Sequence, residues 1–406
     1  MTKDSKGPDG RSTPLEGVVV VDLSRHLPGP LVSRLLSDLG ARVIKVEEPS
    51  SGDPVREAPP FTEEGSALAG ILLAGVESVA LNLKEPGARE VLHDLLGEAE
   101  VLLESFRPGT LARLDLDPEE LRERYPRLVI ASVSGWGQDG PYAARAGHDL
   151  TYEAIGGLLG MTEKMPPAPI ADIVGAWSSV TSILAALLER ERAGRGSWID
   201  VSLLDAAVHS NLTGWASSVA GSGPRTVGLT GSLPCYRLYE AGDGRQLAVA
   251  CLEPHFWKRF CRVAGHPELE KLHLDTSRRA HREVEAVIRS RTRVEWEALL
   301  DEEDLPVEAL LDPGESRRHP QVVARDVLSG AEGAMGPRLR FPTRFDGVRP
   351  RPGGTLPALG ENTEDLLEEL GSSLADRSRR TRRREGVGRK RSLVAWLRRK
   401  WIEWKW

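Results

Sequence analysis

Three residues in this sequence have types and neighbours that suit acid–base chemistry. His148 lies between a glycine and an aspartate, Asp172 directly precedes a long helical pattern, and Glu253 directly precedes a proline. An imidazole has an unperturbed pKa of about 6.5, so both of its protonation states are accessible at neutral pH. A histidine and a carboxylate together can remove a proton from a substrate and return one. A third group such as Glu253 can orient the histidine and stabilise its charged form.

The proton affinity of Asp172 depends on two opposing effects. The apolar spacing of residues 174–194 and their basic, glycine-terminated end predict a buried helix. At the start of that helix, the dipole and the free N–H groups would stabilise the Asp172 carboxylate and lower its pKa. Burial beside a substrate would raise the pKa instead. The sequence alone leaves the balance between the two open.

Taken one at a time, the same residues also have structural explanations. His148 could be a hydrogen-bonded core histidine, and Asp172 could be a plain helix N-cap. Glu253 before a proline is also typical of an ordinary helix start, since proline suits the first helical position. Only a wider pattern along the chain can separate these explanations from a catalytic role.

The composition is that of an ordinary soluble globular protein, with 40% hydrophobic and 28% charged residues. No window supplies about 18 uninterrupted apolar residues, and the polar start does not resemble a signal peptide, so a cytoplasmic location is predicted. The three cysteines, Cys235, Cys251 and Cys261, lack C-x-x-C spacing. They indicate neither a disulfide framework nor a zinc site.

The net charge of −6 combines an acidic body with a basic tail. Residues 372–406 contain thirteen Arg or Lys and three acidic residues, which leaves −16 for the rest of the chain. Because phosphate neutralisation needs cations at the contact, an acidic body argues against a nucleic-acid partner. The four tryptophans and clustered arginines of the tail would allow contact with an anionic membrane surface, but a solvated extension is the simpler interpretation.

Strand-like and helix-like patterns alternate over the first half of the chain. Apolar, β-branched runs predict strands, and runs with helical spacing lie between them; the strand-like runs are 17–24, 41–49, 76–83, 101–105 and 128–135. This alternation predicts an α/β fold with a doubly wound parallel sheet. The first β-α turn lacks G-x-G-x-x-G and no G-x-x-x-x-G-K-[ST] occurs, so neither a nicotinamide enzyme nor a P-loop ATPase is predicted.

The patterns also suggest domain limits. Residues 1–14 are predicted to be a disordered leader, residues 15–214 the large domain, and the Gly-, Ser- and Pro-rich segment 215–228 a linker. A smaller domain is predicted over 229–325, opening with a hairpin over 235–252 whose turn is Ala-Gly-Asp-Gly. Helices are predicted over 253–265, 291–304 and the end of 356–371.

From about Leu15 to Gly371 the chain resembles the family III CoA-transferases (the CaiB/BaiF family) and their relatives, the α-methylacyl-CoA racemases. The likeness rests on separated stretches in matching order: VVDLSRHLPGP, LLSDLGARVIKVEEPSSGDPVR, LNLKEPGA, SFRPGTLARL, SGWGQDGPYAARAGHDLTY, ADIVGAW, GRGSWIDVSLLDA, LEPHFW and LPALGENT. The resemblance implies a Rossmann-like, CoA-binding large domain and a smaller α+β domain. It also implies that residues 326–371 return to the large domain and that two subunits interlock as a homodimer.

Within this family the resemblance favours the racemases, which share the histidine of Gly-His-Asp, the aspartate at the next helix start and a Glu-Pro. These match His148, Asp172 and Glu253. Formyl-CoA transferases have a catalytic glutamine where this chain has Leu27. The implied reaction is 1,1-proton transfer at the α-carbon of a 2-methyl-branched acyl-CoA thioester. The alternative is a CoA-transferase in which Asp172 forms an acyl anhydride and then an aspartyl-CoA thioester.

The resemblance also implies where CoA binds. Lys84, Arg107 and Arg113 match positions that bind the CoA diphosphate, and Phe106 lies near the adenine end. Lysine and arginine suit phosphate because they form charge-assisted hydrogen bonds. Relatives often have arginine where this chain has Glu48, which would repel a phosphate. No metal or redox cofactor is implied, since CoA arrives as part of the substrate.

Overall fold

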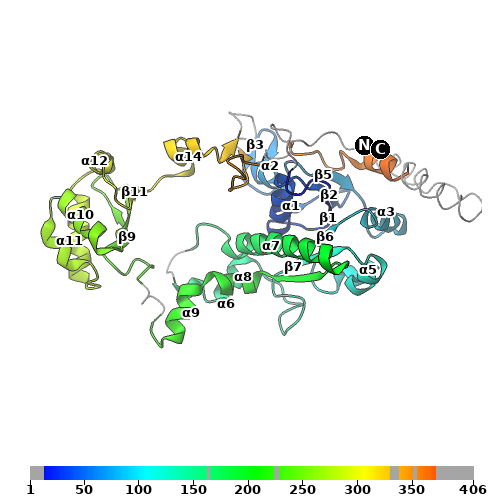
Figure 1. Ribbon diagram of the computed structural model, residues 1–406, viewed down its shortest axis with the longest axis horizontal. Helices are drawn as coiled ribbons and strands as arrows, with labels where there is room; N and C mark the ends of the chain where they lie inside the picture. The colour runs from blue at the N-terminus through cyan, green and yellow to red at the C-terminus, as the bar shows by residue number, and fades with distance from the viewer. Residues whose placement is uncertain (1–12, 162–164, 224–227, 330–337, 351–353, 372–406) are drawn as a thin grey trace, which may run out of the picture. The chain divides into compact units, whose positions relative to one another are not determined.

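The computed structural model describes residues 13–161, 165–223, 228–329, 338–350 and 354–371, which form two compact units. Among the described residues, the large unit comprises 13–153, 168–207, 325–329, 338–350 and 354–371, and the small unit comprises 154–161, 165–167, 208–223 and 228–324. Residues 1–12 of the predicted leader and the whole basic tail, 372–406, lie outside the described residues. Figure 1 shows both units.

A six-stranded parallel sheet forms the centre of the large unit. Its strands are β1 (Val19–Asp22), β2 (Arg42–Glu47), β5 (Glu77–Ala80), β6 (Val101–Glu104), β7 (Val129–Ser134) and β8 (Trp198–Ser202), in the order β5-β2-β1-β6-β7-β8. The predicted doubly wound sheet is confirmed. The chain order reverses between β1 and β6, and in such sheets ligands bind beyond the carboxyl ends of the strands at that point.

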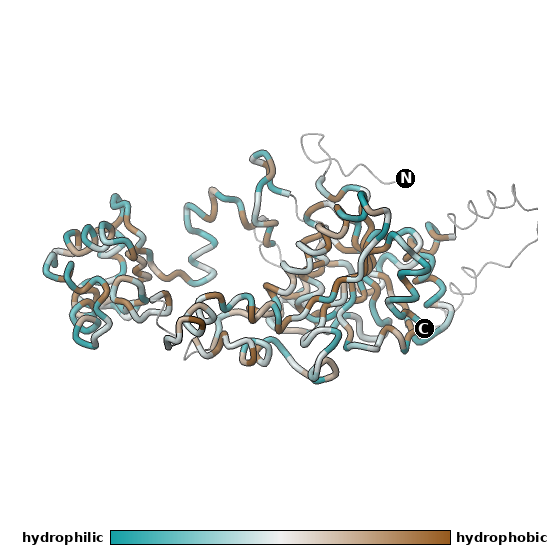
Figure 2. The backbone as a smooth tube through the Cα atoms, turned by 60° about the horizontal axis from the view of Figure 1, so that its bottom comes forward, coloured by the Kyte–Doolittle hydropathy of each residue, from teal (hydrophilic) through white to brown (hydrophobic). Residues whose placement is uncertain are grey.

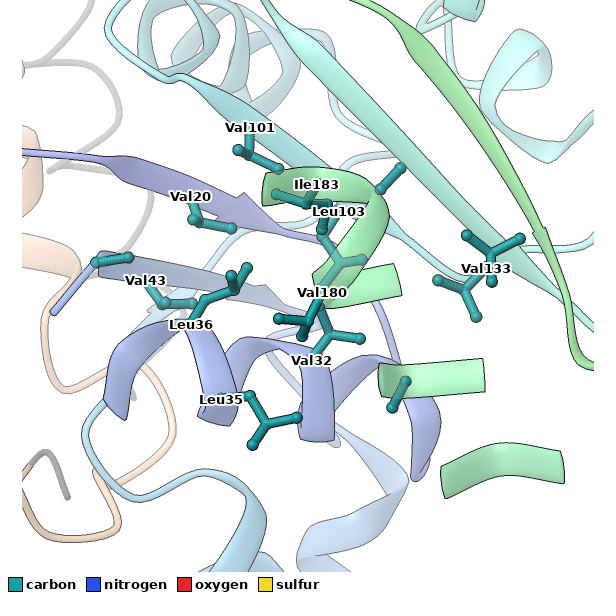
Figure 3. Close-up of a cluster of buried hydrophobic side chains, with 14 of the residues drawn as sticks. Val20, Val32, Leu35, Leu36, Val43, Val101, Leu103, Val133, Val180 and Ile183 are labelled. Carbon is teal, nitrogen blue, oxygen red and sulfur yellow. The ribbon is translucent and has the colours of Figure 1, made fainter. Parts of the chain in front are cut away.

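Alternate residues of the strands face opposite sides of the sheet. Val20, Val43, Val101, Leu103 and Val133 pack against α1 (Pro28–Asp38) and α7 (Ile170–Ala193), as Figure 3 shows. The residues between them, such as Val21, Ile44 and Leu102, pack on the other side against α3 (Pro86–Leu96), α5 (Pro118–Arg124) and the helical residues 363–371. Both faces are covered, which is why these strands carry apolar side chains on both sides of the sheet.

The position of α7 departs from the usual rule for parallel sheets. It connects β7 to β8, moving along the sheet in the direction opposite to the β1–β2 connection. A right-handed crossover would therefore place α7 on the face opposite α1. Instead α7 packs directly on α1, and both helices begin at the carboxyl edge of the sheet. This arrangement places the start of α7 on the same face as the first β-α turn.

Among the described residues, α7 is also the one helix long and apolar enough to cross a membrane by length and composition. Buried residues of this helix, including Ala176, Val180 and Ile183, belong to the core of the large unit. Figure 2 shows hydrophobic residues concentrated on the strands and inner helices of this unit. A core helix explains the apolar composition of α7.

The small unit contains a three-stranded antiparallel sheet of order β11-β10-β9. Its strands are β9 (Tyr236–Glu240), β10 (Gln246–Ala250) and β11 (Val307–Ala309). The β9–β10 hairpin lies where the sequence predicts it. The helices α10 (Pro254–Val263), α11 (Arg278–Arg289) and α12 (Arg293–Leu300) enclose a core that includes Trp257, Phe260 and Trp296. The three cysteines are free thiols, all buried in this core.

The remaining elements are short. The helices are η1 (Pro54–Glu57), α2 (Ala67–Leu72), α4 (Thr110–Arg113), α6 (Asp149–Ile155), η2 (Leu159–Met161), α8 (Leu203–Ser210), α9 (Leu212–Val219), η3 (Pro267–Leu272), α13 (Pro313–Ser316) and α14 (Pro320–Arg325). The strands are β3 (Phe61–Thr62), β4 (Gly65–Ser66), β12 (Leu328–Ser329) and β13 (Arg338–Leu339).

Candidate active site

The two predicted acid–base residues lie at the starts of α6 and α7. His148 immediately precedes α6, and Asp172 is the third residue of α7. The residue before α7 is Pro169, which makes no side-chain cap, so Asp172 is not the N-cap. The explanation of Asp172 as a plain N-cap is therefore wrong.

Side chains of α6 bind the free N–H groups at the start of α7. The Asp172 N–H donates to Oδ1 of Asp149 at 2.9 Å, and the Ile170 N–H donates to Oε1 of Glu153 at 3.0 Å. The Ala171 N–H also bonds to Glu153. These are the donors that a carboxylate at Asp172 could otherwise use. The contact joins the residue next to His148 directly to the backbone of Asp172.

This arrangement decides the proton affinity of Asp172. Burial, followed by repulsion from Asp149 and Glu153, raises the pKa of Asp172 to about 7. The helix start does not offset these effects, because its N–H groups bind the other two carboxyl groups. Asp172 can therefore both release and hold a proton near neutral pH.

Tyr152 of α6 lies near the Asp172 carboxyl group and interacts with it electrostatically. Burial and the charge of Asp172 raise the pKa of the Tyr152 hydroxyl to about 12, while Arg107 opposes the shift. The ring packs edge to face on Trp136, with centroids 4.8 Å apart. A Cβ atom at Gly147 would lie 2.5 Å from the Tyr152 ring, so the glycine before His148 is required by this packing.

The structure holds His148 by its backbone. Its N–H donates to Oγ1 of Thr151 at 3.1 Å, and its carbonyl accepts the Thr151 hydroxyl at 2.7 Å. The residue as a whole is exposed, so it is not a buried core histidine. The two helix starts thus bring His148 and Asp172 into one region of the large unit, with Asp149 between them.

Glu253 belongs to the small unit, whereas His148 and Asp172 belong to the large unit. It is exposed and is the N-cap of α10, with Pro254 at the first helical position. Its carbonyl accepts the N–H groups of Phe256 and Trp257, both at 3.1 Å. The helix-start explanation is confirmed. A role for its carboxylate beside His148 stays a prediction.

The four residues predicted to bind CoA lie on the large unit. Lys84 follows β5, Phe106 and Arg107 follow β6, and Arg113 ends α4. The three cations are exposed and Phe106 is half-buried. Arg113 donates to Oγ1 of Thr110 at 2.8 Å. Lys84, Phe106 and Arg107 share the carboxyl edge of the sheet with the first β-α turn.

Arg25, which the sequence reasoning missed, lies in that turn across the switch point from β6. Its guanidinium carbon is 5.6 Å from the centre of the Phe106 ring. The backbone N–H of Arg25 donates to Oγ of Ser105 at 2.9 Å. A cation directly after the first strand of a doubly wound sheet is the signal that could have identified it.

A cavity of about 180 Å³ lies beside Arg107, lined also by Glu104, Gln138 and Trp198. Burial raises the pKa of Glu104 to about 7, although hydrogen bonds from Ser132 and the Phe106 N–H oppose this. Within the described residues, no cluster of three His, Cys, Asp or Glu could hold a metal ion.

Two departures from the family pattern have local explanations. The Glu48 carboxylate accepts bonds from Ser50 and Ser51, and the Ser50 contact is the main cause that lowers the pKa of Glu48. This charge therefore stabilises its own turn. Leu27 is the N-cap of α1 and makes no side-chain cap bond.

Comparison with known proteins agrees with this fold. The family model for CoA-transferase family III matches residues 15–363. Acetyl-CoA:oxalate CoA-transferase from Acetobacter aceti is 32% identical over 88% of this chain and 96% of its own length. Human alpha-methylacyl-CoA racemase is 31% identical over 88% of this chain and 94% of its own length. A crystal structure of a CaiB/BaiF family protein from Brucella suis matches with a TM-score of 0.78 and 29% identity, covering 89% of this chain and all of that one.

The chain belongs to CoA-transferase family III. It is an enzyme that acts on acyl-CoA, either as a racemase or as a CoA-transferase. Asp149, Tyr152 and Glu153 are further site residues that the sequence reasoning missed. The spacing of Asp149 and Glu153, four residues apart at a helix start, was the available signal.

Proposed function

We propose that this enzyme is an acyl-CoA racemase or epimerase that moves a proton at the α-carbon of a 2-methyl-branched acyl-CoA thioester. The observation that carries this proposal is the half-buried Asp172 carboxyl group, whose pKa is raised to about 7 beside the helix start that holds His148. A group that gains and loses a proton near neutral pH suits proton transfer.

In the proposed reaction the α-carbon binds between His148 and Asp172. One residue removes the α-proton, and the electron pair of the C–H bond moves into the thioester as a planar enolate. The other residue delivers its proton to the opposite face, which inverts the carbon. His148 and Asp172 exchange protonation states in each turnover, and the reverse reaction restores them. Glu253 is proposed to stabilise the charged form of His148.

The alternative is a CoA-transferase in which the Asp172 carboxylate attacks the thioester carbonyl. The similarity to acetyl-CoA:oxalate CoA-transferase favours this alternative. A nucleophile must be ionised, however, and a pKa of about 7 leaves much of Asp172 protonated at neutral pH. Leu27 also offers no hydrogen bond to an anhydride intermediate.

We further propose that Lys84, Arg107 and Arg113 bind the CoA phosphates, with Phe106 beside the adenine. An interlocked homodimer is proposed as the assembly. It is supported by the apolar side chains that α9 exposes, Leu212, Trp215 and Val219, since exposed apolar patches mark interfaces. The proposal includes a cytoplasmic location and no metal or redox cofactor. Membrane contact through the tail concerns residues outside those described.

The deciding experiment follows the α-proton of a 2-methylacyl-CoA in heavy water by NMR. Loss of the proton signal without any added carboxylic acid supports the racemase. Retention of the proton, with CoA moving only when a free carboxylate is added, establishes the transferase instead. His148→Ala should abolish exchange, whereas His209→Ala, at an exposed histidine of α8, should leave it unchanged. Full exchange in His148→Ala would contradict the mechanism.

A further inference from the structure

Glu153 is a buried acid that the proposed reaction does not use. It lies on α6 with no exposed surface. Its Oε1 atom accepts the Ile170 N–H at 3.0 Å, and the carboxyl group also bonds to the Ala171 N–H. One side of this carboxyl group is therefore fixed to the first turn of α7.

The other side of the Glu153 carboxyl group faces Asp149. Its Oε2 atom is buried and has no donor among the described residues. The Glu153 carboxyl group interacts with the carboxyl group of Asp149, whose Oδ1 already accepts the Asp172 N–H. Two acceptor oxygens form a hydrogen bond only when a proton lies between them.

The surroundings favour placing that proton on Glu153. Burial comes first and the Asp149 side chain second among the effects that raise the pKa of Glu153, while the Ile170 and Ala171 N–H groups oppose them. The charged or titratable groups nearby are Asp149 on the same helix, Asp172 on α7, the Tyr152 hydroxyl, and Arg107, which acts on Tyr152.

We propose that Glu153 is a positioning residue for the reaction at Asp172, and that it works as a neutral acid. Its O–H donates to Asp149 while its other oxygen accepts the Ile170 N–H. The pair formed by Glu153 and Asp149 thereby occupies the N–H groups at the start of α7. This inference rests on the proposed function, because it concerns the proton that Asp172 exchanges.

The consequence for Asp172 follows from the competition for donors. A carboxylate that gains hydrogen bonds from helix N–H groups becomes a weaker base. Because Asp149 and Glu153 already hold those groups, Asp172 is left with burial and the charge of Asp149, both of which favour the protonated form. Glu153 thus maintains the proton affinity of Asp172 without contacting the substrate.

Two variants test this idea, with Asp172 titrated by carbon-13 NMR of labelled aspartate in the free enzyme and its signal assigned by its absence in Asp172→Asn. In Glu153→Gln the amide N–H donates to Asp149 and the amide oxygen accepts the Ile170 N–H. The midpoint of the Asp172 titration should stay within about half a pH unit of the wild-type value, and the rate of proton exchange within about threefold of the wild-type rate. In Glu153→Leu the freed N–H groups become available to Asp172, so the midpoint should fall by about one unit.

The matched control is Glu90→Gln, the same chemical change at an exposed position of α3, which should alter neither quantity. A fall in the Glu153→Gln midpoint of one unit or more would show that Glu153 acts as a charge, and would overturn the proposal even if Glu153→Leu does not fold. An unchanged midpoint in a folded Glu153→Leu would also overturn it. The titration needs no substrate, so a wrong reaction would appear separately, as absent exchange in the wild type.

Discussion

The large unit contains two groups of buried or half-buried carboxyl groups that differ in their partners. In the first, which we call the Lys45 network, Lys45 is fully buried and its Nζ lies 3.1 Å from Asp22 and 3.0 Å from Asp53. Burial opposes the charge of Lys45, but Asp22 and Asp53 outweigh it, so its pKa is raised. Nζ also donates to the Ser24 carbonyl at 2.8 Å, and Asp53 accepts the His26 N–H. This network fixes the first β-α turn.

The second group, which we call the carboxyl cluster, consists of Asp149, Glu153 and Asp172. Within the described residues, no ion pair joins any of the three to a cation, and the N–H groups of α7 are their main donors. Burial therefore raises the pKa of Glu153 and of Asp172. Paired buried charges hold a structure together, whereas unpaired buried acids retain protons that a reaction can use.

The largest expected effect is the loss of catalysis in Asp172→Asn. Removing the titratable group should slow α-proton exchange by at least about a thousandfold, the scale of general acid–base catalysis. Thermal unfolding should occur at the same or a higher temperature, because the change removes a carboxyl group whose charged form is disfavoured by burial and by the charge of Asp149. NMR exchange assays and thermal melts measure the two effects. A destabilised Asp172→Asn, or one with exchange within tenfold of the wild type, would contradict the comparison.

The next largest effect should be a loss of stability on changing Lys45, because the Lys45 network depends on the positive charge of this residue. Lys45→Met leaves Asp22 and Asp53 buried without a cation, which should cost about 3–5 kcal/mol of unfolding free energy. Urea unfolding measures this cost, and failure to obtain folded protein has the same meaning. The control is Arg122→Met at the exposed pair with Glu119, where about 0–1 kcal/mol is expected. Equal costs at the two sites would refute the distinction.

The sequence predicts the strands well, because each strand is marked by a β-branched, apolar run within its own residues. Five of the six strands of the large sheet, all except β8, and the β9–β10 hairpin lie within predicted runs. No pattern within α7 itself predicts on which face of the sheet it packs, because its position depends on a crossover that departs from the usual hand.

The candidate site also has one part that the sequence predicts and one part that depends on packing. Motifs identify His148 and Asp172, because these residues are defined by their immediate neighbours. The proton affinity of Asp172 is not predictable from them, since it depends on Glu153, nineteen residues away along the chain, binding the N–H groups of α7. Burial and competition for donors exist only after the helices pack.

A smaller effect should appear in the pH dependence of stability. The pKa of Asp172 is about 7 in the folded protein, against 3.8 for the free group. Between these values the unfolded chain loses the proton that the folded protein keeps. Stability from this group is therefore fully present below pH 4 and is lost as pH rises to 7, by at most roughly 1.4 kcal/mol per pH unit.

Urea unfolding of the wild type and Asp172→Asn at several pH values tests this sign. The two proteins should differ least near pH 4, and Asp172→Asn should gain relative stability up to pH 7, by about 3 kcal/mol at most. The contributions of the other carboxyl groups to the pH dependence are similar in the two proteins, so they largely cancel in the difference between the two unfolding free energies. A stability difference that stays constant across this range would show that Asp172 titrates normally.

The smallest expected effect concerns Arg107, a cation that belongs to neither group and lies exposed at the carboxyl edge of the sheet. If it binds a CoA phosphate, Arg107→Ala should weaken the binding of acyl-CoA about tenfold, and less at high salt, because exposed charges are screened. Affinity for the matching acyl-pantetheine thioester, which lacks the diphosphate, should not change. Calorimetry measures both, with Arg127→Ala at an exposed pair with Glu191 as the control. Equal losses for the two thioesters would mean that Arg107 acts through Tyr152 and the carboxyl cluster, not through phosphate.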